Sequence, residues 1–163
     1  MEPIRMGFIG CGGNARGHIG RVLEMGECEV VSLCDSSEGS LQAACEHYGE
    51  DVEHLPRFVD YKEMLDSVEM DAVQISTPHT LHFEQIMASL DKGLHVLSEK
   101  PMVCTVDHAH QVIAKAEESG KVLMVSYQRH LGAQYRYVRN QIMAGELGEI
   151  QFISALQDQA WYR

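Results

Sequence analysis

A glycine-rich turn close to the start of the chain could bind an anion without any charged side chain. Residues 7–15 read Gly-Phe-Ile-Gly-Cys-Gly-Gly-Asn-Ala, with an apolar run before the turn and a helical pattern after it. Gly10 permits a tight turn, Gly12 leaves the backbone open to a phosphate, and the small Ala15 lets a helix lie close to a strand. The first N–H groups of that helix would face the anion. The turn is interpreted as a pyrophosphate site, the alternative being an ordinary tight turn.

Asp35 adds a second chemical group at the spacing that such a turn requires. It ends the next apolar run, about 20 positions after Ala15, as in dinucleotide-binding βαβ units. Its carboxylate can accept hydrogen bonds from both hydroxyls of a ribose, and it would repel a 2′-phosphate. Neither Ser36 nor Ser37 is the arginine that usually accompanies NADP. The sequence therefore predicts NAD in preference to NADP. The alternative is that Asp35 only caps the following helix.

The histidines and cysteines show no spacing typical of metal ligands, and we expect no metal site. His108 and His110 fall on different sides of one helix, so they do not form a metal-binding pair. The five cysteines are odd in number, scattered and without a C-x-x-C pair, which favours reduced thiols and a cytoplasmic location. Cys11 is interpreted as a small residue that fits the turn. Four histidines are interpreted as surface or packing residues: His18, His47, His54 and His95.

Composition limits the partners of the chain. The 163 residues include 13 basic and 24 acidic side chains, for a net charge of −11. A chain this acidic is not expected to bind nucleic acid through a broad basic face. It has no basic segment followed by an apolar run at its start, and no apolar stretch long enough to span a bilayer. We therefore expect neither a signal peptide nor a membrane partner.

Strands and helices alternate along almost the whole chain. We expect strands at 4–9, 29–34, 57–59, 72–76, 94–98 and 122–126. We expect helices at 14–25, 38–48, 80–90, 106–119 and 133–144, a short helix capped by Asp60 and ending near 65, and an irregular polar segment at 50–57. Three glycines are expected to end helices: Gly93, Gly120 and Gly145.

This order predicts an α/β fold, a Rossmann doubly wound parallel sheet with helices on both faces. Ligands of such sheets lie beyond the carboxyl ends of the strands, where the strand order reverses. The segments just past the strand ends are 10–15, Asp35, 76–79, 98–101 and 127–130. We expect these segments to converge on one edge of the sheet.

The last residues follow a different pattern. Residues 149–156 partly alternate between polar and apolar, which predicts a strand with one solvated face. We interpret it as the first strand of a truncated second (α+β) domain, the alternatives being an added edge strand or a pairing with another subunit. The predicted organisation is a dinucleotide-binding domain at 1–125, a connecting segment and helix at 126–148, and the start of the second domain at 149–163.

Four segments together resemble one family. Residues 7–15, Ser-Thr-Pro-His-Thr-Leu-His at 76–82, Glu-Lys-Pro at 99–101 and Tyr-Gln-Arg-His at 127–130 are similar to segments of the Gfo/Idh/MocA oxidoreductases. The resemblance extends to Gly-Glu-Leu-Gly-Glu-Ile at 145–150, where the second domain of such proteins begins. It implies a nicotinamide cofactor, and a second domain that forms the substrate pocket and the oligomer interface.

The resemblance also implies a role for each matching position. The residues that would bind the pyrophosphate are Gly10, Gly12, Gly13, Asn14 and Ala15, and Asp35 would bind the adenosine ribose. Those that would line the rest of the cofactor are Ser76, Thr77, Pro78, His79 and His82, with Glu99, Lys100 and Arg129 near the nicotinamide. The family more often has Asn at the position of His79.

Lys100 is the residue that the resemblance identifies as catalytic. It would bond the substrate hydroxyl that loses its proton, as a hydrogen-bond donor or as a relay base. The alternative is a solvated loop lysine. Because Lys100 precedes Pro101, its backbone is biased to an extended conformation, and the sequence leaves open whether the bond is cis or trans.

The resemblance implies an NAD-dependent oxidoreductase acting on CH–OH groups. A hydride would pass between a secondary alcohol of a sugar or cyclitol and the nicotinamide, with this chain as the cofactor-binding domain. Two alternatives remain: an NAD-retaining glycoside hydrolase that oxidises C3 transiently, and a non-catalytic NAD-binding regulator. The implied partners are a small sugar or polyol and further copies of the protein in a homo-oligomer. The fragment alone is expected to bind cofactor but to catalyse poorly.

Overall fold

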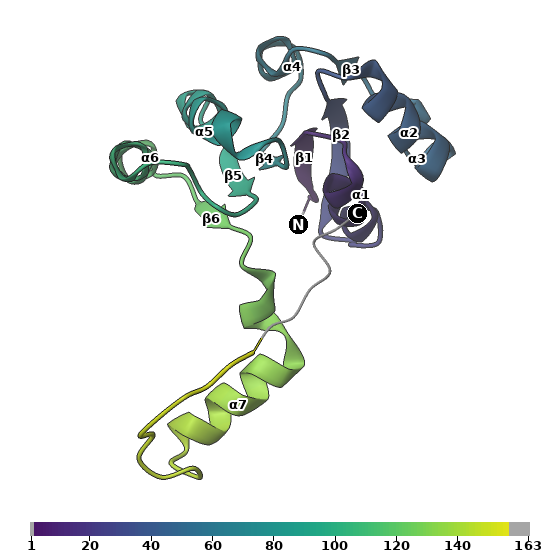
Figure 1. Cartoon of the computed structure of the whole chain (residues 1–163). Coiled ribbons are helices and arrows are strands. Elements are labelled where there is room, and N and C mark those ends of the chain that lie inside the picture. Colours follow the sequence, from purple (N-terminus) through teal and green to yellow (C-terminus); the bar gives the residue numbers. More distant parts are fainter. Residues whose placement is uncertain (1, 157–163) are drawn as a thin grey trace. The chain divides into compact units, whose positions relative to one another are not determined.

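A parallel six-stranded sheet forms the first part of the chain (Figure 1). The computed structural model describes residues 2–156, and those up to Ser126 form one compact unit. The strand order is β3-β2-β1-β4-β5-β6, and each neighbouring pair is parallel. The strands are β1 (Ile4–Ile9), β2 (Cys28–Cys34), β3 (Arg57–Phe58), β4 (Ala72–Ile75), β5 (His95–Ser98) and β6 (Leu123–Val125).

Helices cover both faces of this sheet (Figure 1). Successive residues of a strand point to opposite faces, so the neighbours Phe8 and Ile9 belong to two different cores. Phe8 packs with residues of α1 (Gly13–Leu23), α2 (Glu38–Tyr48) and α3 (Glu50–Glu53). Ile9 packs with residues of α4 (Tyr61–Ser67), α5 (His82–Asp91) and α6 (Val106–Ser119). The predicted Rossmann doubly wound sheet is confirmed.

Local sequence signals explain where most of these helices begin and end. Ser37, Asp60 and Thr105 each accept a hydrogen bond from a backbone N–H in the first turn of α2, α4 and α6. Gly120 ends α6 with a φ of 64°, in the left-handed region that glycine adopts easily. The start of α1 is different, because its N-cap is Gly12, which has no side chain to accept a hydrogen bond.

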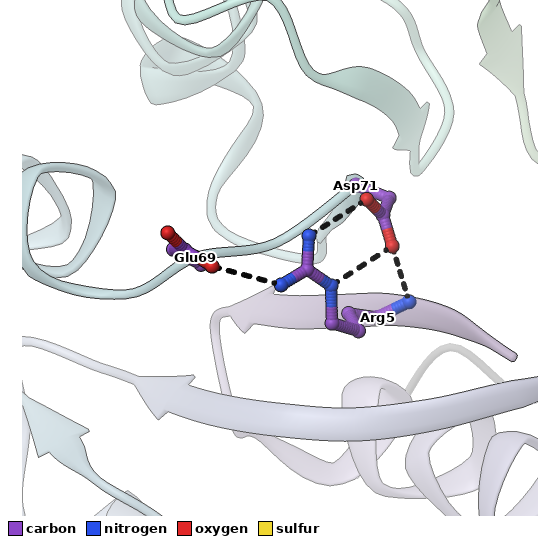
Figure 2. Close-up of polar contacts among 3 residues, drawn as sticks. All are labelled: Arg5, Glu69 and Asp71. Atoms are coloured by element: carbon purple, nitrogen blue, oxygen red, sulfur yellow. Dashed lines mark hydrogen bonds and ion pairs between the residues drawn. The ribbon is translucent and has the colours of Figure 1, made fainter. Parts of the chain in front are cut away.

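An ion pair joins the amino ends of the two central strands (Figure 2). Arg5 of β1 donates to Asp71, which directly precedes β4, through Nη2 to Oδ1 at 3.0 Å and Nε to Oδ2 at 3.2 Å. A third bond runs from Arg5 Nη1 to Glu69 Oε2 at 3.3 Å. The hydrogen bond from Arg5 lowers the pKa of Asp71, so the carboxylate stays charged. This two-point contact fixes the strands at the edge opposite the glycine turn.

Several boundaries differ from those expected. The segment 50–57, which was expected to be irregular, contains the one-turn helix α3. Val52 of this helix is fully buried, so the turn packs against the core. The helix expected at 80–90 begins with a tighter turn, η1 (His79–Leu81), which continues as α5. Strand β6 is shorter than the expected 122–126, although the backbone N–H of Val96 still donates to the carbonyl of Val122.

A second compact unit begins at Tyr127. It contains the short helix η2 (Gln128–Leu131) and α7 (Ala133–Met143), which ends before Gly145 as expected. The structure corrects the expectation of a strand at 149–156, because residues 151–156 have no regular secondary structure. A strand requires a hydrogen-bonded partner, and none of residues 2–156 pairs with this segment. Residues 157–163 of the predicted third segment lie outside the described residues.

Candidate functional site

The loops that follow β1, β2, β4 and β5 meet at one edge of the first unit, as expected, whereas residues 127–130 belong to the second unit. The backbone N–H of Gly10 donates to Cys34 O at 2.7 Å, that of Ser76 to Ile9 O at 2.8 Å, and that of Glu99 to Ile75 O at 2.8 Å. Each strand end is therefore bonded to the loop of its neighbour. Strands β1 and β4 are adjacent in the sheet although β2 and β3 separate them in the sequence. The strand order reverses here, which is where ligands of such sheets bind.

A cavity of about 320 Å³ opens at this reversal point. Six of the predicted site residues line it: Gly10, Gly12, Asp35, Ser76, Thr77 and Pro78. Gly13, Asn14 and Ala15 follow Gly12 in the first turn of α1, where Ala15 is fully buried. The glycine turn and the carboxylate of Asp35, which were predicted from separate sequence signals, thus line the same cavity.

Gly10 occupies a position that no other residue type fits well. Its φ is 95°, and a Cβ built on it would lie 2.7 Å from the backbone carbon and oxygen of Ser76. Gly12 is the opposite case, because a Cβ built there meets no atom within 4 Å. The space over Gly12 is open, so a ligand can approach the backbone at this point.

The first turn of α1 presents unbonded N–H groups. The first hydrogen bond of this helix runs from Arg16 N to Gly12 O at 3.0 Å. Among the described residues, no group accepts from the backbone N–H of Gly13, Asn14 or Ala15, and no acidic side chain lies in this turn. The positive end of the helix is therefore free for an anion, and phosphate fits this chemistry.

Asp35 faces the glycine turn with both carboxylate oxygens anchored. Oδ2 accepts from the backbone N–H of Cys11 at 2.8 Å, and Oδ1 accepts from that of Ser37 at 2.9 Å. Each carboxylate oxygen can accept about two hydrogen bonds. One acceptor position per oxygen therefore remains for a ligand, at a half-buried side chain whose direction is fixed.

Cys11 lies in the same turn but is not available for reaction. Its side chain is fully buried, and its Sγ donates to Cys34 O. Burial, followed by the charge of Asp35, raises the pKa of the Cys11 thiol to about 12. The residue stays a neutral thiol that fills the turn.

Part of the cavity lining is apolar, which the sequence did not lead us to expect. This part is lined by Val59, directly after β3, Tyr61, the first residue of α4, and Leu81 of η1. A flat apolar group suits such a wall. The sequence carried a signal for these residues, because residues 59 and 61 also follow the end of a predicted strand. The segment after the short β3 was not included among the expected ligand-binding loops.

The loop after β4 is fixed by its own polar contacts. Thr77 Oγ1 donates to Gln85 Oε1 at 2.5 Å, and Gln74 Nε2 donates to Ser76 Oγ at 3.4 Å. His82 is fully buried beneath this loop, with Nε2 3.0 Å from Thr77 O and Nδ1 2.8 Å from Pro101 O. The ring of His82 thus lies between the loops after β4 and β5, within hydrogen-bond distance of a backbone carbonyl in each.

Glu99 is buried, with 6% of its surface exposed, and its partner His18 was not foreseen. Glu99 Oε1 lies 2.8 Å from His18 Nε2, and Oε2 accepts from the backbone N–H of Lys100 at 3.2 Å. Burial acts to raise the pKa of Glu99, but hydrogen bonds from His18, Asn14 and Lys100 outweigh it and hold the pKa below 4.5. The periodicity carried a signal, because residues 15, 18, 19 and 22 share the buried face of α1.

Acid should therefore destabilise the fold through Glu99. Its folded-state pKa is lowered, so its stabilising effect is complete above the ordinary value of 4.5 and is lost as the pH falls through the lower folded value. As the pH falls below 4.5, we expect the melting temperature of the wild type to fall more steeply than that of Glu99→Gln. Asp71 is present in both proteins, so its own titration contributes equally to both. Parallel curves of melting temperature against pH would therefore contradict a stabilising effect of the Glu99 carboxylate on the fold.

Lys100 follows β5 at the site edge and is exposed. Its peptide bond to Pro101 is cis, which answers the question left open by the sequence. In the part of the chain described, its ammonium group makes no hydrogen bond or ion pair, so it remains available to a ligand. His79 is exposed in η1. Arg129 belongs to η2 of the second unit, and the structure does not place it relative to this edge.

The fold and the site define a dinucleotide-binding Rossmann domain. A profile of the "Oxidoreductase family, NAD-binding Rossmann fold" (Gfo/Idh/MocA) matches residues 4–127. The chain belongs to this family, and its residues 4–127 match the family's NAD-binding Rossmann fold.

Most of this chain can be aligned with named relatives. It is 31% identical to D-glucoside 3-dehydrogenase of Escherichia coli over 155 residues, which are 94% of this chain and 43% of that protein. It is 28% identical to alpha-N-acetylgalactosaminidase of Shewanella oneidensis, over 92% of this chain and 34% of that protein. The chain thus spans less than half of the length of these relatives.

A solved structure supports the same comparison. The WlbA dehydrogenase from Bordetella pertussis, crystallised in complex with NADH and UDP-GlcNAcA, superposes with a TM-score of 0.82 at 31% identity. The match covers 90% of this chain and 44% of that chain.

Within residues 2–156, no helix combines the length and apolarity that crossing a bilayer requires.

Proposed function

We propose that this chain is the cofactor-binding domain of an NAD-dependent oxidoreductase that acts on a secondary alcohol of a sugar or cyclitol. One observation carries the cofactor part of the proposal: an uncapped glycine turn and a carboxylate that is hydrogen-bonded to this turn line the same cavity. NAD carries both matching groups, a pyrophosphate and an adenosine ribose. When bound, it supplies the hydride chemistry that protein side chains lack.

The residues present fit such a cofactor. The open backbone at Gly12 and the N–H groups of residues 13–15 would hold the pyrophosphate. Asp35 would accept hydrogen bonds from the ribose hydroxyls, and the apolar wall of Val59 and Leu81 would contact the adenine. Ser76, Thr77, Pro78 and His79 would line the cofactor along the loop after β4.

Lys100 would act on the substrate. Its ammonium group is free of protein partners in the described part of the chain, and it follows the strand next to β4 at the site edge. From there it would donate a hydrogen bond to the reacting oxygen or relay the proton that the alcohol loses. The names of the glucoside and WlbA dehydrogenases support a sugar-like substrate.

The chain covers less than half of its relatives. We therefore propose that the substrate pocket and the contacts of a homo-oligomer lie in the region that corresponds to the rest of those relatives. The five cysteines are all free thiols, which supports a reducing, cytoplasmic location.

A second candidate is an NAD-retaining glycoside hydrolase, and the 28% identity to an alpha-N-acetylgalactosaminidase favours it. The two functions differ in their products. The protein that contains this chain should be incubated with NAD and a panel of free polyols and sugars, and separately with aryl glycosides. Net NADH from a polyol or sugar supports the dehydrogenase. Glycoside cleavage without net NADH supports the hydrolase, and tight NADH binding with neither activity supports a regulator.

Asp35→Asn should lower the preference for NADH over NADPH by about tenfold or more. A hydrogen bond to a charged group contributes about 1.5–3 kcal/mol, and about 1.4 kcal/mol corresponds to a factor of ten in affinity. The variant also removes the repulsion that the carboxylate exerts on a 2′-phosphate. Calorimetric titration of the 163-residue chain with each dinucleotide measures the ratio of the two affinities.

Asp60→Asn is the matched control for this measurement. Asp60 caps α4 by accepting a hydrogen bond from the backbone N–H of Lys62 at 2.8 Å, and Asp35 likewise accepts one from the backbone N–H of Ser37 at 2.9 Å. A variant that only loses a helix cap should leave the NADH to NADPH ratio unchanged. An equal ratio in the wild type and in both variants would mean that Asp35 only anchors the turn before α2, whose N-cap is Ser37.

A further inference from the structure

Two ionisable side chains are buried together at the site edge. His18 is 9% exposed and Glu99 is 6% exposed, and 2.8 Å separates His18 Nε2 from Glu99 Oε1. His18 lies on α1, two turns after the glycine turn begins, whereas Glu99 follows β5. The pair therefore joins the phosphate-binding helix to the segment that carries Lys100.

The Glu99 carboxylate receives hydrogen bonds from three separate directions. His18 and the Asn14 side chain reach it from α1, and the backbone N–H of Lys100 donates to Oε2 at 3.2 Å. Asn14 is itself part of the exposed first turn of the helix. One buried carboxylate thus connects the anion-binding turn, the body of α1 and the backbone of Lys100.

The same short segment is also held from other sides. The backbone N–H of Glu99 donates to Ile75 O at 2.8 Å, and Pro101 O lies 2.8 Å from the buried ring of His82. The backbone on each side of Lys100 is therefore anchored, while its side chain is free. Such an arrangement is typical of a group that must be held in a fixed place to act.

We propose that His18 is a positioning residue that fixes Lys100 relative to the phosphate-binding turn, acting through Glu99. The inference rests on the function proposed above for Lys100. His18 touches neither the substrate nor the reacting atoms; it holds the carboxylate that holds the Lys100 backbone.

A purely structural role explains the pair poorly. The neighbouring positions on this face of α1 are Ala15, Ile19 and Val22, which pack without any polar group. Replacing a buried ion pair by well-packed apolar residues is often neutral or stabilising. An apolar pair would therefore serve the core as well as His18 and Glu99 do, but it would leave the N–H of Lys100 without its acceptor.

The test compares three variants of the pair and one control variant with the wild type. His18→Leu removes the donor, and His18→Gln keeps an N–H donor close to the position of Nε2. The double variant His18→Leu with Glu99→Leu removes the pair without leaving a buried charge, which keeps the experiment valid if His18→Leu alone fails to fold. Val22→Ala is the control, because Val22 lies on the same buried face of α1 but packs in the apolar core and is not a hydrogen-bond partner of Glu99.

Two readouts are measured. The first is the amide hydrogen exchange of Lys100, followed by NMR in the 163-residue chain. The second is kcat, together with KM for NAD, in the protein that contains the chain. We expect faster exchange at Lys100 and a kcat about 10- to 100-fold lower in His18→Leu and in the double variant. KM for NAD should change much less, His18→Gln should recover most of both readouts, and Val22→Ala should change neither.

Each contrary outcome has a distinct meaning. Unchanged Lys100 exchange in both leucine variants would overturn the inference, as would a kcat loss in Val22→Ala equal to that in His18→Leu. If the wild-type protein turns over no substrate at all, the proposed function of Lys100 fails instead. The exchange measurement then still decides whether His18 holds the Lys100 backbone.

Discussion

Lys100→Met should lower kcat of the oxidoreductase by about 10²–10⁴-fold while NADH binding changes little, because general acid–base catalysis by a positioned side chain contributes about that factor. Methionine keeps the length and flexibility of the side chain but cannot donate a proton or a hydrogen bond. The loss should therefore appear in the chemical step, with the Kd for NADH within about threefold of the wild-type value.

The structure explains why the loss should be confined to catalysis. The Lys100 side chain is exposed, and in the described part of the chain it makes no hydrogen bond or ion pair that contributes to the fold. The contact of Lys100 with Glu99 uses the backbone N–H, which methionine retains. The melting temperature of Lys100→Met should accordingly match that of the wild type.

Lys121→Met is the matched control for this prediction. Lys121 precedes β6, so it lies at the amino end of that strand, away from the loops that follow the strands. The Lys121→Met substitution removes the same positive charge without changing the site. Equal kcat values in the wild type and in Lys100→Met would rule out a catalytic lysine, and an equal loss in both variants would point to net charge instead.

Much of this architecture could be predicted from local sequence signals. The glycine turn, Asp35 and the loop after β4 were found because each requires a residue type that backbone geometry or ligand chemistry dictates. The rule that strand carboxyl ends converge then placed them together, and the cavity lined by Gly10, Gly12 and Asp35 bears this out. These are short-range requirements, which is why a single sequence suffices to reveal them.

The parts that were missed depend on contacts between distant residues. His18 pairs with Glu99 across 81 positions of sequence, and nothing near His18 shows that a carboxylate lies opposite. The apolar wall at Val59 and Tyr61 depends on how far the short β3 extends. The strand expected at 149–156 failed for a related reason, because alternation specifies a side-chain pattern but not a pairing partner.

Gly10 and Gly12 look equivalent in the sequence, but the structure predicts opposite consequences for their substitution. Gly10→Ala should be strongly destabilising, because forcing alanine to a φ of 95° adds strain and its Cβ would lie 2.7 Å from the backbone of Ser76. Backbone strain of this kind costs about 1–3 kcal/mol, and overpacking costs about 1–3 kcal/mol more. Thermal unfolding should show a melting temperature far below that of the wild type.

Gly12→Ala should instead keep the melting temperature and lose the cofactor. Its φ of −66° suits alanine, and the added methyl group meets no protein atom within 4 Å. The methyl group would occupy the open space through which a phosphate approaches the helix N-terminus, so NADH affinity should fall by about tenfold or more, as expected for at least one lost charged hydrogen bond. Calorimetric titration with NADH measures this loss.

Gly17→Ala completes the set as a control, because its Cβ also meets no atom within 4 Å and it lies in the same helix, one turn beyond the anion-binding residues. Alanine in an exposed helix interior is more favourable than glycine by about 1 kcal/mol, so this variant should melt slightly higher and bind NADH normally. A Gly12→Ala variant that also binds normally would show that the open backbone at Gly12 is not where the pyrophosphate lies. The anion site would then have to be sought elsewhere along the edge.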